Sequence, residues 1–139
     1  MFVVFEGLDK SGKGTLEWEL LKATNFKHII IDRGPAGYLT FDLLFGRVTD
    51  EKQKECADNI VLMRDTGKFV VIYCKVPADI AIQRINEHNE ECPYNYEYAQ
   101  EIYNDVVETL YKDEGIKVIE VDTTKSIEDC LNLILGGLK

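Results

Sequence analysis

Near its start the chain reads Phe2-Val3-Val4-Phe5-Glu6-Gly7-Leu8-Asp9-Lys10-Ser11-Gly12-Lys13-Gly14-Thr15. The first four residues are β-branched or aromatic and do not alternate with polar ones, which is typical of a strand buried on both faces. An amphipathic helix is expected at about 13–24, where apolar residues recur every three to four positions. Gly7 and Gly12, with Lys13 directly after, therefore lie between a strand and a helix. That is the setting of a Walker A phosphate-binding loop.

Glycine suits such a loop for a physical reason. Several backbone N–H groups must turn inward around one phosphate, in a conformation that is hostile to Cβ atoms. The amino end of the following helix adds roughly half a positive charge. Lys13 would then bridge the outer phosphates. The alternative is a glycine turn with a surface lysine, but the flanking strand and helix favour the phosphate loop.

Along the rest of the chain, strand-like and helix-like segments alternate. Strands are expected at 2–5, 28–32, 69–74 and 116–121, and helices at about 13–24, 36–46, 50–66, 77–85, 96–111 and 126–135. Strands separated by helices form right-handed crossovers, so the sheet is expected to be parallel and covered by helices. The fold class is therefore α/β: four to five parallel strands in a three-layer α/β/α sandwich, the P-loop NTPase fold. No repeat or linker interrupts it, so residues 1–139 are interpreted as one domain.

Length and composition set further bounds. The chain has 139 residues, of which 45% are hydrophobic and 29% charged, as in an ordinary globular domain. A formal charge of −9 disfavours the basic surface of a nucleic-acid binder, so no nucleic-acid partner is expected. Apolar runs are far shorter than the about 20 residues of a bilayer span, and no secretory signal precedes the first strand. We therefore expect no membrane partner and a cytoplasmic location. Four cysteines without metal-site spacing are expected to be reduced thiols: Cys56, Cys74, Cys92 and Cys130.

Two motifs resemble those of a known family. Phe5-Glu6-Gly7-Leu8-Asp9-Lys10-Ser11-Gly12-Lys13 resembles the Phe-Glu-Gly-x-Asp-Gly-x-Gly-Lys opening of the thymidylate kinases, and Ile31-Asp32-Arg33 resembles their Asp-Arg motif. Weaker likeness at 71–85 and 118–128 extends the resemblance to about half of the chain. The resemblance implies a P-loop kinase that uses ATP and Mg²⁺, and the small size of the chain suggests a compact, phage-type version of it.

Gly14 departs from the Walker A pattern. The residue after the loop lysine is normally Ser or Thr, whose hydroxyl binds Mg²⁺. Here Gly14 follows Lys13 and Thr15 comes one position late, a Gly-Lys-Gly-Thr order that resembles the adenylate kinases. We therefore expect Thr15 and, through water, Asp32 to meet the metal.

Asp32, Arg33 and Asp9 are the candidates for the acceptor side. Asp32 ends a parallel strand, where such sheets bind ligands, so it can hold Mg²⁺ through water or orient the acceptor oxygen. Arg33 has a fork that fits phosphate oxygens, and the resemblance implies contact with the acceptor phosphoryl group. The resemblance also places Asp9 against the sugar 3′-hydroxyl. The alternatives are a capping role for Asp32 and a surface position for Arg33.

The helix at 36–46 is expected to hold the acceptor base. Phe41-Asp42 stand where thymidylate kinases hold thymine with a Tyr-Gln pair, and Gly37 stands where serine is common in that family. Phe41 keeps a stacking surface, but the carboxylate of Asp42 only accepts hydrogen bonds, whereas an amide also donates. The identity of the base therefore stays open. Tyr38 and Phe41 are substrate candidates, with ordinary core packing as the alternative.

Arg84 and the polar stretch 86–95 resemble a lid, because mobile polar segments close over phosphates and exclude water. Lids of the family are rich in arginine, whereas this stretch carries three glutamates, so Arg84 would act alone. A helix-surface salt bridge is the alternative for Arg84. The loop 122–125 lies where related kinases approach adenine. The expected ATP-binding residues are Gly7, Lys10, Ser11, Gly12, Lys13, Gly14, Thr15 and Thr124. Lys10 either adds charge to the phosphate cradle or projects into solvent.

One segment of the family is missing. Between the first helix and the Asp-Arg strand, thymidylate kinases carry an extra strand and an arginine that grips the acceptor phosphate, where this chain has only 25–27. Arg33, with Arg47 or Arg64, would have to supply that charge. The acceptor could therefore be a nucleoside or another small alcohol.

The first functional hypothesis is transfer of the γ-phosphoryl group of ATP to a deoxynucleoside monophosphate, with dTMP first among the acceptors. The expected catalytic residues are Lys13, Asp32, Arg33 and Arg84. The alternatives are a kinase for deoxynucleosides or other small metabolites and a nucleotide-binding module without transfer activity. A small-molecule nucleotide is the expected partner. Related kinases commonly pair through helices, and the apolar helices at 36–46 and 50–66 could form a homodimer.

Overall fold

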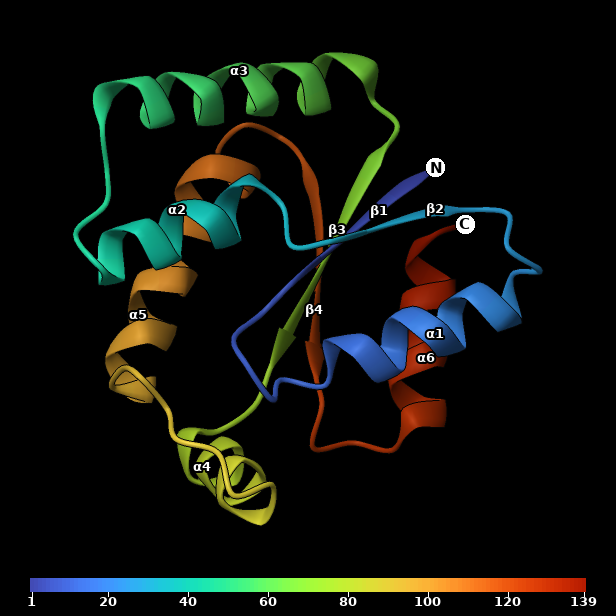
Figure 1. Ribbon diagram of the computed structural model, residues 1–139. Helices are drawn as coiled ribbons and strands as arrows, with labels where there is room; N and C mark the ends of the chain where they lie inside the picture. The colour runs from blue at the N-terminus through green and yellow to red at the C-terminus, as the bar shows by residue number, and fades with distance from the viewer.

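Four parallel strands form the sheet of this computed structural model, which describes all 139 residues (Figure 1). They are β1 (Phe2–Glu6), β2 (Ile29–Asp32), β3 (Phe69–Lys75) and β4 (Lys117–Asp122), in the order β2-β1-β3-β4. β1 pairs with both β2 and β3, so that Val4 lies between Ile31 and Val71. Because the strands run in one direction, their carboxyl ends meet at one edge of the sheet, where such folds bind ligands.

Helices connect the strands and cover both faces of the sheet. They are α1 (Lys13–Ala23), α2 (Pro35–Leu44), α3 (Asp50–Thr66), α4 (Ala78–Glu87), α5 (Tyr96–Val107) and α6 (Ile127–Gly137), with a π-helical turn η1 (Glu108–Lys112) directly after α5. Figure 1 shows α1 and α6 on one side of the strands and α2, α3 and α5 on the other.

Two apolar clusters hold these layers together. Val3 and Phe5 point toward α1 and α6, where they pack with Leu20 and Ile134. Val4 belongs to the opposite cluster, beneath α2, α3 and α5. Both faces of β1 are therefore buried, which explains why this strand is a continuous apolar run. The predicted three-layer α/β/α fold with a parallel sheet is confirmed, with four strands.

The helix expected at 96–111 is divided into two parts. α5 ends at Val107, and the chain continues as the π-helical turn η1. Other boundaries differ by one or two residues. Pro77 is the N-cap of α4 rather than its first residue. Ser126 caps α6 as expected, because its Oγ accepts a hydrogen bond from the Asp129 N–H.

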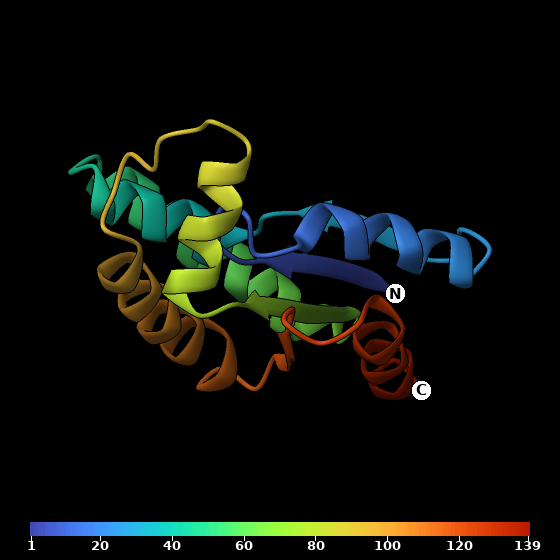
Figure 2. The same cartoon turned by 90° about the horizontal axis from the view of Figure 1, so that it is seen from below.

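The segment expected to act as a lid begins inside α4. Since α4 runs to Glu87, the irregular part is 88–95, the yellow arch between α4 and α5 in Figure 2. The Nζ atom of Lys10 lies 3.0 Å from Oε1 of Glu90. This segment is therefore tied to the loop that follows β1.

All four cysteines are free thiols. Cys74 and Cys130 are buried, and burial raises the pKa of Cys74 to about 12. Their role is apolar packing rather than chemistry. None of the helices is both long enough and apolar enough to cross a lipid bilayer.

Candidate active site

The loop between β1 and α1 is wound as a phosphate cradle requires. Gly7 and Gly12 have φ values of +149° and +88°, in the region that favours glycine. A Cβ atom on Gly7 would lie 2.6 Å from Oγ of Ser11 and 2.7 Å from the carbonyl oxygen of Cys74. Lys10 also has a positive φ, of 62°, at the position where thymidylate kinases have glycine. The chain thus turns tightly before the amino end of α1, where anions bind.

Lys13 faces the carboxyl end of β2. Its Nζ atom lies 3.4 Å from Oδ1 of Asp32, so two predicted catalytic residues are brought together. Partial burial would raise the pKa of Asp32, but a hydrogen bond from Glu17 and the charge of Lys13 outweigh it, and this pKa lies below its ordinary value. Asp32 is therefore ionised at neutral pH.

Glu17 belongs to the same cluster, although the sequence motifs do not single it out. It follows Lys13 by one helical turn and so shares its face of α1. Burial, and next the neighbouring carboxylate of Asp32, raise the pKa of Glu17 to about 7. The spacing of four residues from Lys13 is the one sequence signal that could have indicated it.

The donor set at this point suits Mg²⁺. Kinases commonly hold Mg²⁺ through one or two carboxylates together with the phosphates of the nucleotide. No group of three or more metal-ligating side chains meets in the structure, and Asp32 and Glu17 are the carboxylates beside Lys13. Thr15 is exposed and lies two residues from both Lys13 and Glu17, on another face of α1. No hydrogen bond joins Thr15 to Asp32, and the expected metal pair stays a prediction.

A second cluster lies on the acceptor side of the phosphate loop. The guanidinium carbon of Arg33 lies 4.2 Å from the ring centroid of Phe41, and its Nη2 atom lies 3.7 Å from Oδ1 of Asp9. Arg33 has a positive φ of 66°, a strained conformation for a residue with a side chain. Its Nε atom is buried and has no hydrogen-bond partner. Three predicted acceptor residues, Asp9, Arg33 and Phe41, are thus adjacent.

Two tyrosines that the sequence motifs do not indicate complete this cluster. The hydroxyl of Tyr94 donates to Oδ2 of Asp9 at 3.1 Å, and that of Tyr96 donates to its carbonyl oxygen at 3.3 Å. The ring of Tyr94 meets that of Phe41 edge to face, with centroids 5.8 Å apart. The segment 88–95 therefore adds an aromatic wall beside the expected base-stacking residue.

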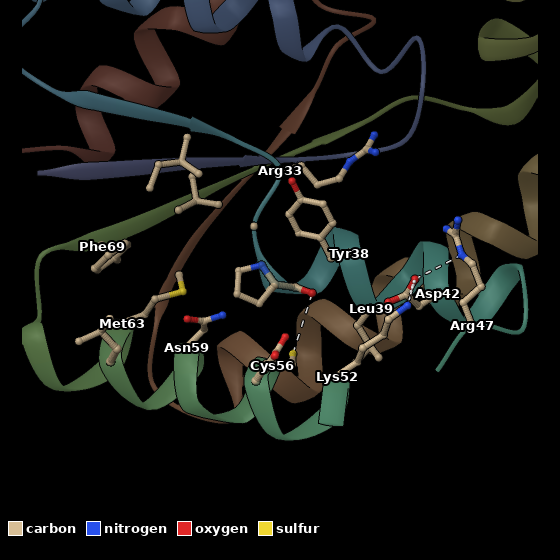
Figure 3. A pocket seen from close by; sticks show the side chains of 16 residues that line it. Arg33, Tyr38, Leu39, Asp42, Arg47, Lys52, Cys56, Asn59, Met63 and Phe69 are labelled. Atoms are coloured by element: carbon tan, nitrogen blue, oxygen red, sulfur yellow. Dashed lines mark hydrogen bonds and ion pairs between the residues drawn. The ribbon is translucent and has the colours of Figure 1, made fainter. Parts of the chain in front are cut away.

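Tyr38 and Asp42 lie along a cavity of about 700 Å³ between α2 and α3, which Arg33 also lines. Figure 3 shows Asp42 pointing toward Arg47 and Lys52, with which it forms ion pairs of 3.4 and 3.5 Å. The ring of Tyr38 is exposed and lines the same cavity. Arg33 therefore connects these two substrate candidates with the cluster of Asp9 and Phe41.

The remaining cations considered for the acceptor phosphate are paired. Arg47 contacts Asp42, as described above. Arg64 lies on α3 between two carboxylates, 3.1 Å from Asp65 and 2.8 Å from Glu114. Of these three arginines, Arg33 is the one that lies beside the phosphate loop, where it contacts Asp9.

Arg84 joins the phosphate loop to the end of β4. Its Nη1 atom donates to the carbonyl oxygen of Lys10 at 2.9 Å, and its Nη2 atom donates to that of Thr123 at 3.0 Å. These residues border a cavity of about 300 Å³, which Thr15 and Lys125 also line. The expected base contact, Thr124, instead donates twice to Oδ1 of Asp122 from its N–H and hydroxyl groups.

Two further loop residues have distinct environments. The Oγ atom of Ser11 is buried and has no hydrogen-bond partner. Gly14 is exposed, and a Cβ atom at this position would meet nothing within 4 Å. A hydroxyl-bearing side chain therefore has room directly after Lys13.

Glu6, the last residue of β1, is fully buried beside the start of α2. Its carboxylate accepts hydrogen bonds from the N–H groups of Gly34 and Gly37, each at 3.0 Å. It also accepts from the hydroxyls of Tyr103 and Tyr111, at 2.9 and 2.6 Å. Burial raises the pKa of Glu6, and these four donors act in the opposite direction. The anion site at the amino end of α2 is therefore filled by the protein itself.

Comparison with solved structures identifies the class of fold. No protein-family profile matches the chain, and no curated protein matches its sequence. The YorR protein from Bacillus subtilis, solved with phosphorylated GDP, superposes with a TM-score of 0.73 and 17% identity, over 99% of this chain and 95% of that chain. Fold similarity at this level of identity establishes architecture, not activity.

Two structures of deoxyadenosine kinase from M. mycoides share the fold. The form with bound dCTP has a TM-score of 0.68 and 18% identity, covering 99% of this chain and 98% of the other. The form with bound dATP has a TM-score of 0.61 and 21% identity, covering 99% of each. The chain thus has the fold of the P-loop nucleoside kinases, and the narrower resemblance to thymidylate kinases stays a prediction.

Proposed function

We propose that this protein transfers the γ-phosphoryl group of ATP to a hydroxyl group of a nucleoside. The observation that carries the proposal is the 3.4 Å contact between Lys13 and Asp32, because it joins the phosphate loop to the end of the neighbouring strand. The donor phosphates would lie at Lys13 and the acceptor oxygen at Asp32. Catalysis in such transfers is mainly alignment and charge neutralisation.

The residues in place can account for each part of the reaction. The acceptor oxygen would attack the γ-phosphorus, the bond from that phosphorus to the β–γ bridging oxygen would break, and ADP would leave. The ionised carboxylate of Asp32 would take the hydroxyl proton. Lys13 and the loop N–H groups would stabilise the charge on the phosphoryl oxygens. Mg²⁺ would supply further charge neutralisation when bound, and Glu17 and, through water, Asp32 would hold it.

A nucleoside suits the acceptor side better than a monophosphate. The N–H groups at the amino end of α2 would otherwise bind an anion, but Gly34 and Gly37 donate to Glu6 and Ala36 donates to the hydroxyl of Tyr111. The base would stack beside Phe41, and the sugar would reach Asp9.

A deoxynucleoside monophosphate such as dTMP is the second candidate acceptor. The buried Nε atom of Arg33 has no partner, and guanidinium groups bind phosphate oxygens well. In that reaction an oxygen of the acceptor phosphate attacks, so no hydroxyl proton has to be removed. Asp32 would then orient the acceptor rather than act as a base.

A panel of acceptors tests the proposal. ADP release from ATP and Mg²⁺ would be measured with each deoxynucleoside and each deoxynucleoside monophosphate. Release that depends on a nucleoside supports the proposal, and release that depends on dTMP supports the second candidate. If the protein bound ATP but released no ADP in any mixture, it would be a nucleotide-binding module without transfer activity. Asp32→Asn should abolish transfer to a nucleoside, while Asp65→Asn, an exposed aspartate on α3, should leave it unchanged.

A further inference from the structure

Glu6 links the phosphate loop to the acceptor side through hydroxyl groups that both accept and donate. The hydroxyl of Tyr103 accepts from the Gly7 N–H at 2.9 Å and donates to Glu6. The hydroxyl of Tyr111 accepts from the Ala36 N–H at 3.2 Å and donates to Glu6. We call Glu6, Tyr103, Tyr111 and the N–H groups that they bind the Glu6 network. All four partners of the Glu6 carboxylate donate hydrogen bonds to it. The ionised carboxylate, which only accepts, can therefore form all four bonds.

The π-helical turn puts Tyr111 in reach of Glu6. Residues seven apart share a face of a regular α-helix, since seven residues make almost two turns. Tyr103 and Tyr111 are eight apart. The extra residue of η1 brings the second tyrosine back to the face of the first, and both side chains are fully buried. An irregular turn of this kind is frequent at functional sites.

Two glycines leave the space that the Glu6 network occupies. A Cβ atom on Gly37 would lie 2.7 Å from Oε1 of Glu6 and 2.7 Å from the hydroxyl oxygen of Tyr103. A Cβ atom on Gly34 would lie 2.9 Å from the hydroxyl oxygen of Tyr111. These close approaches leave no room for a side chain at position 37. They explain why this chain has glycine where the thymidylate kinases, which it resembles, commonly have serine.

The Glu6 network also holds the strained turn of the acceptor side. Arg33 keeps a positive φ, which costs of the order of 1–3 kcal/mol unless surrounding contacts enforce it. Its neighbour Gly34 donates to Oε1 of Glu6, and its own N–H donates to the carbonyl oxygen of Phe5 at 2.8 Å. Both contacts come from the end of β1, directly before the phosphate loop. The directions of Asp32 and Arg33 are thus set relative to that loop.

We propose that Glu6, Tyr103 and Tyr111 are positioning residues that align the Asp32-Arg33 turn with the phosphate loop for phosphoryl transfer. This inference rests on the proposed function, because it assigns the alignment of donor and acceptor to this network. None of the three touches the reacting atoms. They act through Gly7 on the donor side and through Gly34, Ala36 and Gly37 on the acceptor side. Displacement of about 1 Å at such a site can lower the rate by about 100-fold.

Three tyrosine variants test the proposal. Tyr111→Phe and Tyr103→Phe each remove one hydroxyl from the network and keep the ring. Tyr73→Phe is the matched control, because its hydroxyl also bonds α5, through Asn104 and Gln100, and forms no hydrogen bond with the network. Its ring packs against that of Tyr103, with centroids 5.3 Å apart, and this contact is kept when only the hydroxyl is removed. Each variant would be compared with the wild type in melting temperature, ATP affinity, kcat and the KM of the acceptor.

The expected outcome separates alignment from stability. All three variants should melt earlier by a similar amount. Tyr111→Phe should lower kcat by about tenfold or more per folded molecule, with ATP affinity within about twofold, whereas Tyr73→Phe should keep kcat within about twofold. If Tyr111→Phe and Tyr73→Phe lost stability alike and kept the same kcat, the network would be structural only and the proposal would be wrong.

Amide hydrogen exchange decides the inference even if no acceptor is phosphorylated. Tyr111→Phe should accelerate exchange at Asp32, Arg33 and the first turn of α2 relative to the wild type, and Tyr73→Phe should not. Protection that is unchanged in Tyr111→Phe would overturn the positioning role. If the two variants show this pattern but the wild type transfers phosphate to no acceptor, the proposed function alone would be refuted.

Discussion

The Nζ atom of Lys13 lies 3.4 Å from Oδ1 of Asp32, and the two side chains differ in exposure, 13% for the lysine and 64% for the aspartate. The ammonium group is thus held at the amino end of α1, while the carboxylate faces solvent from the end of β2. An entering triphosphate would compete with Asp32 for the lysine. Release of this ion pair would leave the aspartate close to the transferred phosphoryl group, where an acceptor must lie.

Replacement of Lys13 tests the electrostatic part of this arrangement. Lys13→Ala should lower kcat by at least about 100-fold, because one charge aimed at the phosphoryl oxygens is lost. The melting temperature should change little, since Asp32, the partner of Lys13 in the ion pair, is exposed and stays hydrated without the lysine. Steady-state kinetics and thermal unfolding measure both quantities. Lys22→Ala is the control on the same helix, and an active Lys13→Ala protein would refute the assignment of the phosphate loop.

A side chain at position 14 tests how the metal is held. Gly14→Ser places a hydroxyl directly after Lys13, in space where nothing lies within 4 Å. The Mg²⁺ concentration for half-maximal activity should fall severalfold, because the Walker A serine binds this metal. Gly14→Ala is the control, since it changes the backbone in the same way and lacks the hydroxyl. Both variants should be more stable than the wild type by up to about 1 kcal/mol, because glycine disfavours helices.

Equal Mg²⁺ dependence in Gly14→Ser and Gly14→Ala would show that a hydroxyl at this position does not reach the metal. Asp32 and Glu17 would then be the groups to examine by substitution.

Much of the fold could be predicted from the sequence because its signals are local. Each signal involves only a few neighbouring residues: the apolar run predicts β1, the two glycines predict the loop, and Ser126 predicts the start of α6. The π-helical turn could not be predicted in this way. It brings Tyr111 to Glu6, which is 105 residues away in the chain, so no local pattern indicates it.

The candidate site was predictable to a similar extent. Motif spacing identified Lys13, Asp32 and Arg33, which the structure brings to the same region. Helical phase separates the other candidates. Asp42 directly follows Phe41 and so points to a different side of α2, toward Arg47 and Lys52. Tyr94 reaches Asp9 only through the path of the segment 88–95, which no local pattern encodes.

The ion pair between Lys10 and Glu90 predicts how a charge change at position 90 affects ATP affinity. Glu90→Gln should tighten ATP binding severalfold at low salt, because a negative charge near the phosphates is removed and Lys10 becomes free to approach them. The gain should shrink at high salt. Glu91→Gln is the control, since its carboxylate forms no ion pair with Lys10. ATP affinity from calorimetry measures the effect, and equal gains in both variants would indicate general charge rather than this contact.

The raised pKa of Glu17 predicts how stability depends on pH. Because this pKa is about 7 in the folded protein and 4.5 is its ordinary value, protonated Glu17 stabilises the fold below about pH 4.5, and that contribution is lost as pH rises through 7. Glu17→Gln, which stays neutral, should therefore gain stability relative to the wild type between pH 5 and 8, by about 1 kcal/mol after allowance for solvent screening. Urea unfolding at several pH values measures the difference. Glu19→Gln, on the same helix, should give a nearly constant difference, and a constant difference for Glu17→Gln as well would show that the pKa of Glu17 is not raised in the folded protein.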